Sequence, residues 1–124
     1  MRQTIHTDKA PQAIGPYVQG VSLGDLVFTA GQIALRPDGT MAEGDIKEQT
    51  HQVLKNLQAI LEAAGSSLDE AIKTTVFLSD LNDFAAMNEV YSSYFPSNKP
   101  ARTTVQVSRL PRGAKIEVEC VAHK

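Results

Sequence analysis

The sequence has little cysteine, no excess of basic charge and no long apolar run, and each shortage excludes a class of protein. One cysteine among 124 residues rules out an internal disulfide, so a reducing cytoplasm is the expected compartment. The net charge of −2 provides no basic stripe for phosphates, so we do not expect nucleic acid as the main ligand. The apolar runs are too short to cross a membrane, and the first residues lack the apolar stretch of a signal peptide.

The usual residues of metal, phosphate and covalent chemistry are also missing. His6, His51 and His123 lie far apart, without the spacing of metal ligands. No serine stands in a nucleophile elbow, and no glycine pattern matches a phosphate or dinucleotide loop. Cys120 is expected on a buried strand face, where a thiol is an ordinary small apolar side chain. We therefore expect chemistry that uses no metal, no cofactor and no covalent nucleophile.

What the chain does contain predicts one globular domain over residues 1–124. An apolar share of 42% and a charged share of 21% are ordinary for a globular fold, and no repeat or linker interrupts the chain. Asp45 and Glu48 have the spacing of a capping box, and apolar residues then recur at helical spacing as far as Gly65. A second helix with one apolar stripe is predicted at roughly residues 81–95.

Strands are predicted over residues 17–23, 26–31, 72–78, 102–107 and 115–122, and the opening residues leave room for one more. Gly24-Asp25 has the form of a tight turn that joins the first two strands as a hairpin. The order strand, strand, helix, strand, helix, strand, strand predicts an α+β fold, a mixed sheet with both helices on one face.

The predicted sheet has a second face that no element of the chain covers. Alternation along the last strand places four apolar residues under the helices, namely Ile116, Val118, Cys120 and Ala122. The opposite face receives Lys115, Glu117 and Glu119. Other strands carry apolar residues on both sides, namely Val18, Val27, Phe28, Val105 and Val107. We therefore expect another subunit to cover this face.

Arg102 opens one of the predicted strands. A strand rarely carries arginine on a covered face without a partner, because an unpaired charge out of water is costly. If the last two strands pair antiparallel as a hairpin, Arg102, Thr104 and Gln106 share a face with Glu117 and Glu119. Two interpretations then stay open. Arg102 forms a cross-strand ion pair with either glutamate, or it forms a two-pronged clamp for a small carboxylate.

Asn88, Tyr17 and Gly31 are further candidates. Asn88 projects along the apolar stripe of the second helix, and a buried amide needs hydrogen-bond partners from either nearby backbone or a ligand. Gly31, at the end of the first hairpin, allows a ligand or a neighbouring chain to approach the main chain, although a simple bulge also explains a glycine there. Tyr17 follows Gly15-Pro16 in the opening loop.

Eight short segments, spread over almost the whole chain, carry a resemblance to a known family: Ala13–Tyr17, Gly31–Ile33, Lys73–Phe77, Asp80–Phe84, Met87–Tyr91, Pro100–Arg102, Arg109–Pro111 and Lys115–Glu119. The chain resembles the Rid family, also called YjgF-type, the enamine/imine deaminases. This resemblance implies a chorismate-mutase-like fold of the bacillus type. It also implies a homotrimer whose sheets form a central barrel, with the helices outside and the sites in the clefts between subunits.

The resemblance further implies a reaction and residue roles. Family members hydrolyse 2-aminoacrylate-type enamines and their imine tautomers, such as 2-iminopropanoate and 2-iminobutanoate, to 2-oxo acids and ammonia without a cofactor. Arg102 is expected to clamp the substrate carboxylate, and Glu117 to orient and deprotonate the attacking water. The main chain of Gly31 and Thr104 is expected to bind the imine nitrogen and the carboxylate. Tyr17 and Asn88 are expected to shape the pocket, with Tyr17 contributed across the subunit boundary.

Two positions depart from the common family pattern, and two other functions remain open. Thr104 stands where many members have cysteine, so no thiol-dependent step is expected here. Ala30 replaces a frequent serine, which removes a hydroxyl from the pocket wall. A non-catalytic trimer that binds small carboxylates would need Arg102 but not Glu117. RNA cleavage, an activity ascribed to some family members, is disfavoured by the acidic charge balance.

Overall fold

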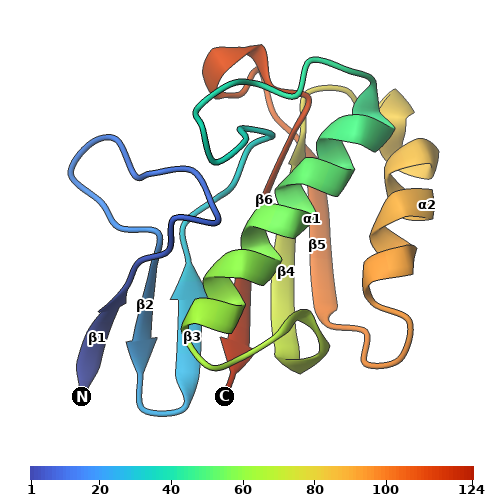
Figure 1. Ribbon diagram of the computed structural model, residues 1–124. Coiled ribbons are helices and arrows are strands. Elements are labelled where there is room, and N and C mark those ends of the chain that lie inside the picture. The colour runs from blue at the N-terminus through green and yellow to red at the C-terminus, as the bar shows by residue number, and fades with distance from the viewer.

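The computed structural model describes all 124 residues as one six-stranded mixed sheet with two helices on one face (Figure 1). The sheet order is β1-β2-β3-β6-β4-β5. The strands are β1 Arg2–Ile5, β2 Gly20–Leu23, β3 Leu26–Thr29, β4 Ala71–Leu78, β5 Ala101–Gln106 and β6 Ile116–His123. The helices are α1 Ile46–Ala63 and α2 Phe84–Tyr94. The α+β architecture expected from the sequence is therefore confirmed, including the additional strand at the N-terminus.

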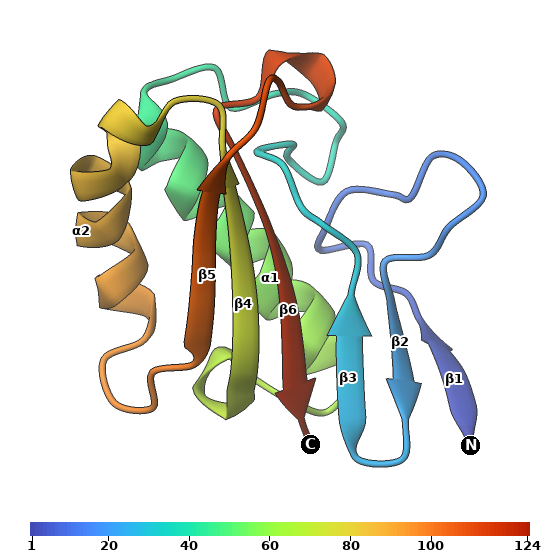
Figure 2. The ribbon, with the colours of Figure 1, turned by 180° about the vertical axis from the view of Figure 1, so that it is seen from behind.

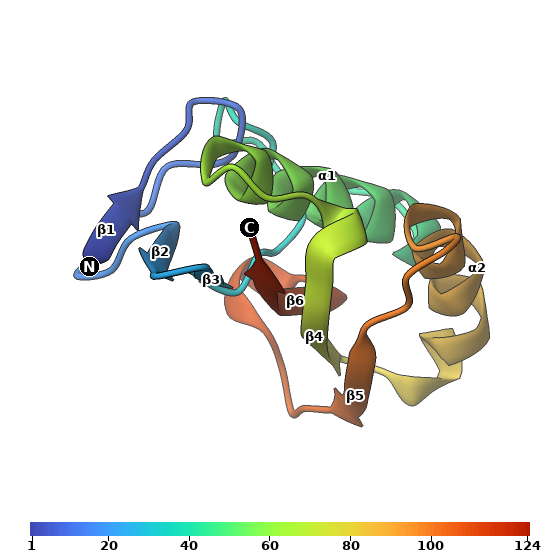
Figure 3. The ribbon, with the colours of Figure 1, turned by 90° about the horizontal axis from the view of Figure 1, so that it is seen from below.

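The first helix, α1, begins and ends where local signals place it. Asp45 caps α1 because its Oδ1 accepts a hydrogen bond of 2.9 Å from the N–H of Glu48, and Gly65 follows the helix with φ of +83°. The predicted second helix divides into a short 3₁₀ turn, Leu81–Asp83, and then α2. Viewed from below in Figure 3, α1 and α2 lie on the same side of the sheet.

The topology at the β4–β5 edge differs from the prediction. β4 lies between β5 and β6, and it pairs parallel with β5 and antiparallel with β6. The predicted hairpin of the last two strands is therefore wrong. The physical reason is the β4–α2–β5 crossover, because a strand that returns through a helix on one face comes back parallel to the strand it left.

This topology places Arg102 and Glu117 on opposite faces of the sheet. Arg102 is opposite Thr74, which is also opposite Cys120, and Thr74 and Cys120 are buried under the helices. Glu117 is opposite Phe77, one position out of phase with that row, so its side chain belongs to the open face. The prediction that Arg102, Thr104 and Gln106 share a face with Glu117 and Glu119 is thus wrong.

The second difference lies in the opening loop. The strand predicted from Tyr17 begins only at Gly20. Gln19, the residue before it, is buried and organises the loop: its Oε1 accepts from the N–H of Thr7 at 2.7 Å, and its Nε2 donates to the Pro11 carbonyl at 2.8 Å. Because the Gln19 side chain is used to hold the opening loop, this residue does not take part in the alternating pattern of the strand. Strand pairing therefore begins at the next residue, Gly20.

The two faces of the sheet differ as expected. On the helix-covered face the side chains of Val27, Val76 and Val118 are fully buried. The open face, turned toward the viewer in Figure 2, carries no helix. Phe28 remains 42% exposed there, and Val105 38%. Neither helix is long and apolar enough to cross a membrane.

Candidate active site

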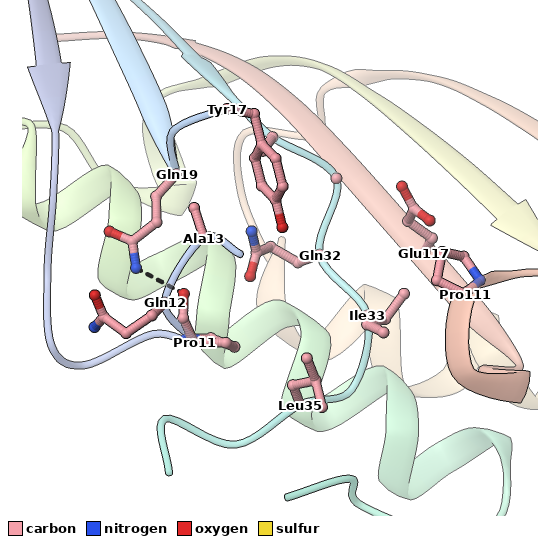
Figure 4. Close-up of a pocket in the computed structure, with 12 residues that line it drawn as sticks. Pro11, Gln12, Ala13, Tyr17, Gln19, Gln32, Ile33, Leu35, Pro111 and Glu117 are labelled. Atoms are coloured by element: carbon pink, nitrogen blue, oxygen red, sulfur yellow. Dashed lines mark hydrogen bonds between the residues drawn. The ribbon is translucent and has the colours of Figure 1, made fainter. Parts of the chain in front are cut away.

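The largest cavity on the open side surrounds Glu117, and we call it the Glu117 pocket. It has a volume of about 450 Å³, and its walls come from the opening loop, the segment after β3, Pro111 and β6. Its principal lining residues are Tyr17, Ala30, Gly31, Gln32, Pro111 and Glu117. In Figure 4 the segment that carries Gln32 and Ile33 passes between Tyr17 and Glu117. Four parts of the chain that are separate in sequence therefore form one cavity.

Gly31 lies against the carboxylate of Glu117. A Cβ atom at this position would stand 2.0 Å from Glu117 Oε2, so no other residue fits here without displacing the carboxylate. Phe28 pairs with Val121, and Gln32 forms a bridge with Val118. The chain therefore advances by four residues from Phe28 to Gln32 but by only three residues along β6, which leaves one extra residue on the Gly31 side. The bulge interpretation of Gly31 is therefore confirmed, and the bulge also brings the main chain close to the carboxylate.

Burial and a neighbouring negative charge both raise the pKa of the Glu117 carboxyl. Glu117 is partly buried, and this burial raises its pKa above the ordinary value, with a further contribution from the negative charge of Glu119 two residues along the same face. No cation compensates, because no lysine, arginine or histidine lies within ion-pair distance of Glu117. A carboxylate of raised pKa in a cavity is a candidate general base.

A second cavity surrounds Arg102, and we call it the Arg102 pocket. Its volume is about 270 Å³, and it is lined by residues of α2 together with Lys99, Pro100 and Arg102. Asn88 and Ser92 are its polar uncharged members. The pocket contains two cations and no carboxylate, so it favours an anion.

Aromatic rings, not a carboxylate, hold Arg102 in place. Its guanidinium carbon lies 4.7 Å from the ring centre of Tyr91 and 5.5 Å from that of Phe84. The Tyr91 hydroxyl is in turn 2.6 Å from Thr74 Oγ1, which fixes the ring over the sheet. The ion pairs of the chain involve other residues, so the interpretation of Arg102 as one half of a cross-strand ion pair is wrong. Its hydrogen-bonding edge remains open to a ligand.

The predicted site residues therefore form two groups rather than one. Tyr17, Gly31 and Glu117 meet in the Glu117 pocket, and Tyr17 is 54% exposed there. Asn88 and Arg102 meet in the Arg102 pocket. Asn88 is only partly buried, and its amide makes no hydrogen bond to the chain, so neighbouring backbone does not satisfy it.

Thr104 lies two residues beyond Arg102 on the same side of β5, but it does not line the Arg102 pocket. Glu119, the other glutamate of β6, lines a smaller cavity of about 210 Å³ on the open face.

Several lining residues were not predicted from the sequence. Gln32 and Pro111 enter the Glu117 pocket only because the Gln32–Val118 bridge and the turn before β6 bring them there. No local pattern signals such long-range contacts. Tyr91 also lines the Arg102 pocket, and the available signal was its position three residues after Asn88, the spacing of neighbours on one helix face.

The other reactive side chains do not form a site. No group of three His, Cys, Asp or Glu side chains is close enough to hold a metal ion. Cys120 is buried on the helix-covered face, as expected, and this burial raises the pKa of its thiol to about 12. The thiol therefore stays protonated and packs as a small apolar group.

Comparisons with known proteins agree with this arrangement. The family model described as Endoribonuclease L-PSP matches residues 7–124. A RutC family protein of Pyrococcus abyssi is 55% identical over 124 residues, covering 99% of this chain and 98% of the relative. The 2-iminobutanoate/2-iminopropanoate deaminase of Escherichia coli strain K12 is 48% identical over 125 residues, covering 98% of each chain.

A solved structure extends the likeness to three dimensions. The crystal structure of E. coli TdcF with bound serine superposes with a TM-score of 0.94 at 48% sequence identity, covering 98% of each chain. The match extends over both pockets, because it leaves almost none of the chain uncovered. By sequence and by fold, this chain belongs to the Rid family, which is also known under the names YjgF, RutC and endoribonuclease L-PSP.

Proposed function

We propose that this protein is a cofactor-free hydrolase that converts 2-imino acids to 2-oxo acids and ammonia, at a site shared by two copies of the chain. The observation that carries this proposal is the separation of a partly buried carboxylate and an unpaired guanidinium into two pockets on opposite faces. Each pocket supplies what the other lacks. The Glu117 pocket has a base but no cation at the carboxylate, and the Arg102 pocket has two cations but no base.

A homotrimer is the assembly that we propose to join them. One chain cannot bring Glu117 and Arg102 together, because β4 separates their strands and the side chains point to opposite sides of the sheet. A ring of copies places the Glu117 pocket of one subunit beside the Arg102 pocket of the next. The exposed Phe28 and Val105 on the open face provide apolar surface for such a contact.

The chemistry follows from the two pockets. Arg102 binds the substrate carboxylate through two parallel hydrogen bonds, and the Tyr91 ring keeps the guanidinium in plane. Glu117 takes a proton from water while the water oxygen bonds to the carbon of the protonated imine. The main chain of Gly31 and Thr104 binds the substrate nitrogen and carboxylate, and Tyr17 and Asn88 close the pocket around the substrate.

The product forms by return of the proton. Transfer from Glu117 to the nitrogen of the 2-amino-2-hydroxy acid makes ammonia the leaving group, and the C–N bond breaks. The hydroxyl then loses its proton to form the 2-oxo acid. A protonated imine is already electrophilic, so a positioned water and one general base, worth roughly 10²–10⁴-fold, suffice without a metal or a covalent nucleophile.

The relatives support the proposed substrate class. The E. coli relative that is 48% identical is named for 2-iminobutanoate and 2-iminopropanoate, two imines with an α-carboxylate. The TdcF crystal structure holds serine, which carries the same α-carboxylate and an α-nitrogen. Both ligands match a pocket that offers a guanidinium to an anion.

Formation of 2-oxo acid from an enamine generated by a serine or threonine dehydratase tests the proposal. We expect wild type to accelerate this step, and Glu117→Gln and Arg102→Ala each to lose the acceleration. When the two inactive variants are refolded together, activity should return, because about a quarter of the sites in a random ring then combine both native residues. Failure of the mixture to regain activity would show that the site is not shared.

A non-catalytic trimer that binds small carboxylates is the alternative. It needs the Arg102 pocket and makes no use of the raised pKa of Glu117. Equal rates of 2-oxo acid formation for wild type and Glu117→Gln, with binding of 2-oxobutanoate retained in both, would establish this alternative instead.

A further inference from the structure

Gln32 has a buried side chain whose amide makes no hydrogen bond within the chain. The residue is only 7% exposed, and its main chain bonds to that of Val118 at 2.9 and 3.1 Å. An amide has two donor hydrogens and an acceptor oxygen, and leaving them without partners is costly. The Gln32 amide is not sealed off, since Thr104 Oγ1 is the one inaccessible side-chain nitrogen or oxygen without a partner. The partner of the Gln32 amide therefore comes from outside the chain.

The other three buried amide side chains all have a structural role. Gln19 holds the opening loop, as described above. Gln49 Oε1 accepts from the N–H of Lys115 at 2.9 Å, and Asn56 Nδ2 donates to a main-chain carbonyl of the segment after β3 at 2.8 Å. Each of these amides ties two parts of the fold together. Gln32 ties nothing, so a structural role does not explain a polar group at this buried position.

The place of the Gln32 amide in the cavity indicates what it can contact. Gln32 lines the Glu117 pocket. In Figure 4 its side chain points toward the opening loop, on the side of Ala13 and Tyr17, whereas Glu117 lies on the other side of the segment. The cavity of about 450 Å³ falls in the range of roughly 300–1,000 Å³ that holds drug-sized ligands, so a small imine at Glu117 leaves space toward the amide. A substrate side chain can occupy this space.

The lining of the cavity restricts the chemistry of that side chain. The wall near Gln32 is apolar at Pro11, Ile33 and Leu35. No lysine, arginine or histidine lines the cavity, and its one charged member is the carboxylate of Glu117. A second negative charge would have no compensating cation here. The cavity therefore suits a side chain that is neutral and ends in a hydrogen-bonding group.

We propose that the Gln32 amide binds the end of the substrate side chain, and that the Glu117 pocket thereby selects 2-imino acids with a terminal carboxamide. This inference rests on the proposed deaminase function. A carboxamide both donates and accepts, so it satisfies the oxygen and the nitrogen of the Gln32 amide together. An apolar side chain of similar size leaves both without a partner, and a site built to hydrogen-bond discriminates against such a ligand. Gln32 is then a specificity-determining residue.

Matched pairs of 2-imino acids, released from amino acids by an L-amino-acid oxidase and followed by semicarbazide trapping, test this inference. The imines of asparagine and glutamine carry a carboxamide, and those of leucine and methionine are apolar counterparts of similar size. For wild type we expect a higher kcat/KM for the carboxamide member of each pair. Gln32→Met keeps the length of the side chain and removes its hydrogen-bonding groups, so this ratio should fall about tenfold.

Gln12→Met is the matched control. Gln12 lines the same cavity, but its amide is already occupied, because Oε1 lies 2.9 Å from His6 Nε2 and Nε2 donates to Asp8 Oδ1 at 3.3 Å. The ratio for Gln12→Met should stay within about twofold of wild type. An equal fall in both variants, or an unchanged ratio in Gln32→Met, would overturn the inference. Dissociation of a Gln32→Met oligomer on dilution, with the ratio unchanged, would assign the amide to a subunit contact instead.

Affinities of wild type for two 2-oxo acids give a second measurement, which does not depend on the folding of a variant. Calorimetry should show tighter binding of 2-oxosuccinamate, the oxo acid of asparagine, than of 4-methyl-2-oxopentanoate, the oxo acid of leucine. Equal or reversed affinities would contradict the role of Gln32. The proposed function fails separately, if wild type accelerates the hydrolysis of none of these imines and of 2-iminobutanoate neither.

Discussion

The Glu117 pocket and the Arg102 pocket are built in different ways. The Glu117 pocket depends on long-range contacts, since a bulge after β3 places Gly31 against a carboxylate that comes from β6. The Arg102 pocket is more local, because α2 and β5 are neighbours in sequence and Tyr91 supports the guanidinium directly. Burial raises the pKa of the Glu117 carboxyl, whereas the Arg102 guanidinium is stacked on the rings of Tyr91 and Phe84.

This difference has a functional consequence under the proposed mechanism. The pocket that performs proton transfer needs a precise distance between a base and the main chain, and the pocket that binds needs charge and a planar donor. Changes in the Glu117 pocket should therefore act mainly on kcat, and changes in the Arg102 pocket mainly on KM. Three predictions test this distinction.

Gly31→Ala should have the largest effect. The added Cβ would stand 2.0 Å from Glu117 Oε2, so the carboxylate has to move. We expect kcat to fall about 10²-fold, since a misplaced catalytic group of this kind costs that much. The Kd for 2-oxobutanoate provides the control. If the loss acts through Glu117, this Kd stays near that of wild type, whereas a Kd that rises as much as kcat falls would show that the substitution disrupts ligand binding instead.

Arg102→Lys should have an intermediate effect, of about tenfold or more in KM. An ammonium group cannot make two parallel hydrogen bonds to a carboxylate, and it stacks less well on Tyr91. Titration with 2-oxobutanoate, followed by calorimetry, measures the loss directly. A variant that binds and turns over as wild type does would contradict the clamp, and it would remove the contrast between the two pockets.

Glu119→Gln should have the smallest effect, a shift in pH dependence. The negative charge of Glu119 contributes to the raised pKa of Glu117, so the substitution lowers that pKa. The acidic limb of the kcat/KM profile, where Glu117 must be ionised to act as base, should move to lower pH. An unchanged profile would mean that another group titrates in this limb.

The same pKa predicts the sign of a stability effect. Burial raises the pKa of Glu117 in the folded chain, so the unfolded chain releases this proton first as the pH rises. Ionisation of Glu117 therefore costs stability above the ordinary glutamate range. The Glu117→Gln control should melt no lower than wild type at neutral pH, which separates loss of activity from loss of fold.

Much of the architecture was readable from local patterns. The cap at Asp45, the glycine at position 65 and the helical spacing between them predicted α1, and alternation in β6 predicted which of its residues are buried. These signals work because each depends on neighbours within one or two turns or along one strand. The chemical identity of the site residues was readable for a similar reason, since Arg102 and Glu117 stood out as charges in β-prone runs.

The relative positions of Arg102 and Glu117 in space could not be predicted from the sequence. A hairpin would have joined Arg102 to Glu117, but the parallel return of β5 beside β4 separates them and leaves each in a different pocket. The residue types and their secondary structure follow from the order of amino acids, because helix caps and strand alternation are local. Sheet order, the bulge at Gly31 and the unsatisfied hydroxyl of Thr104 depend on which strands meet in space, and only the packed fold determines that.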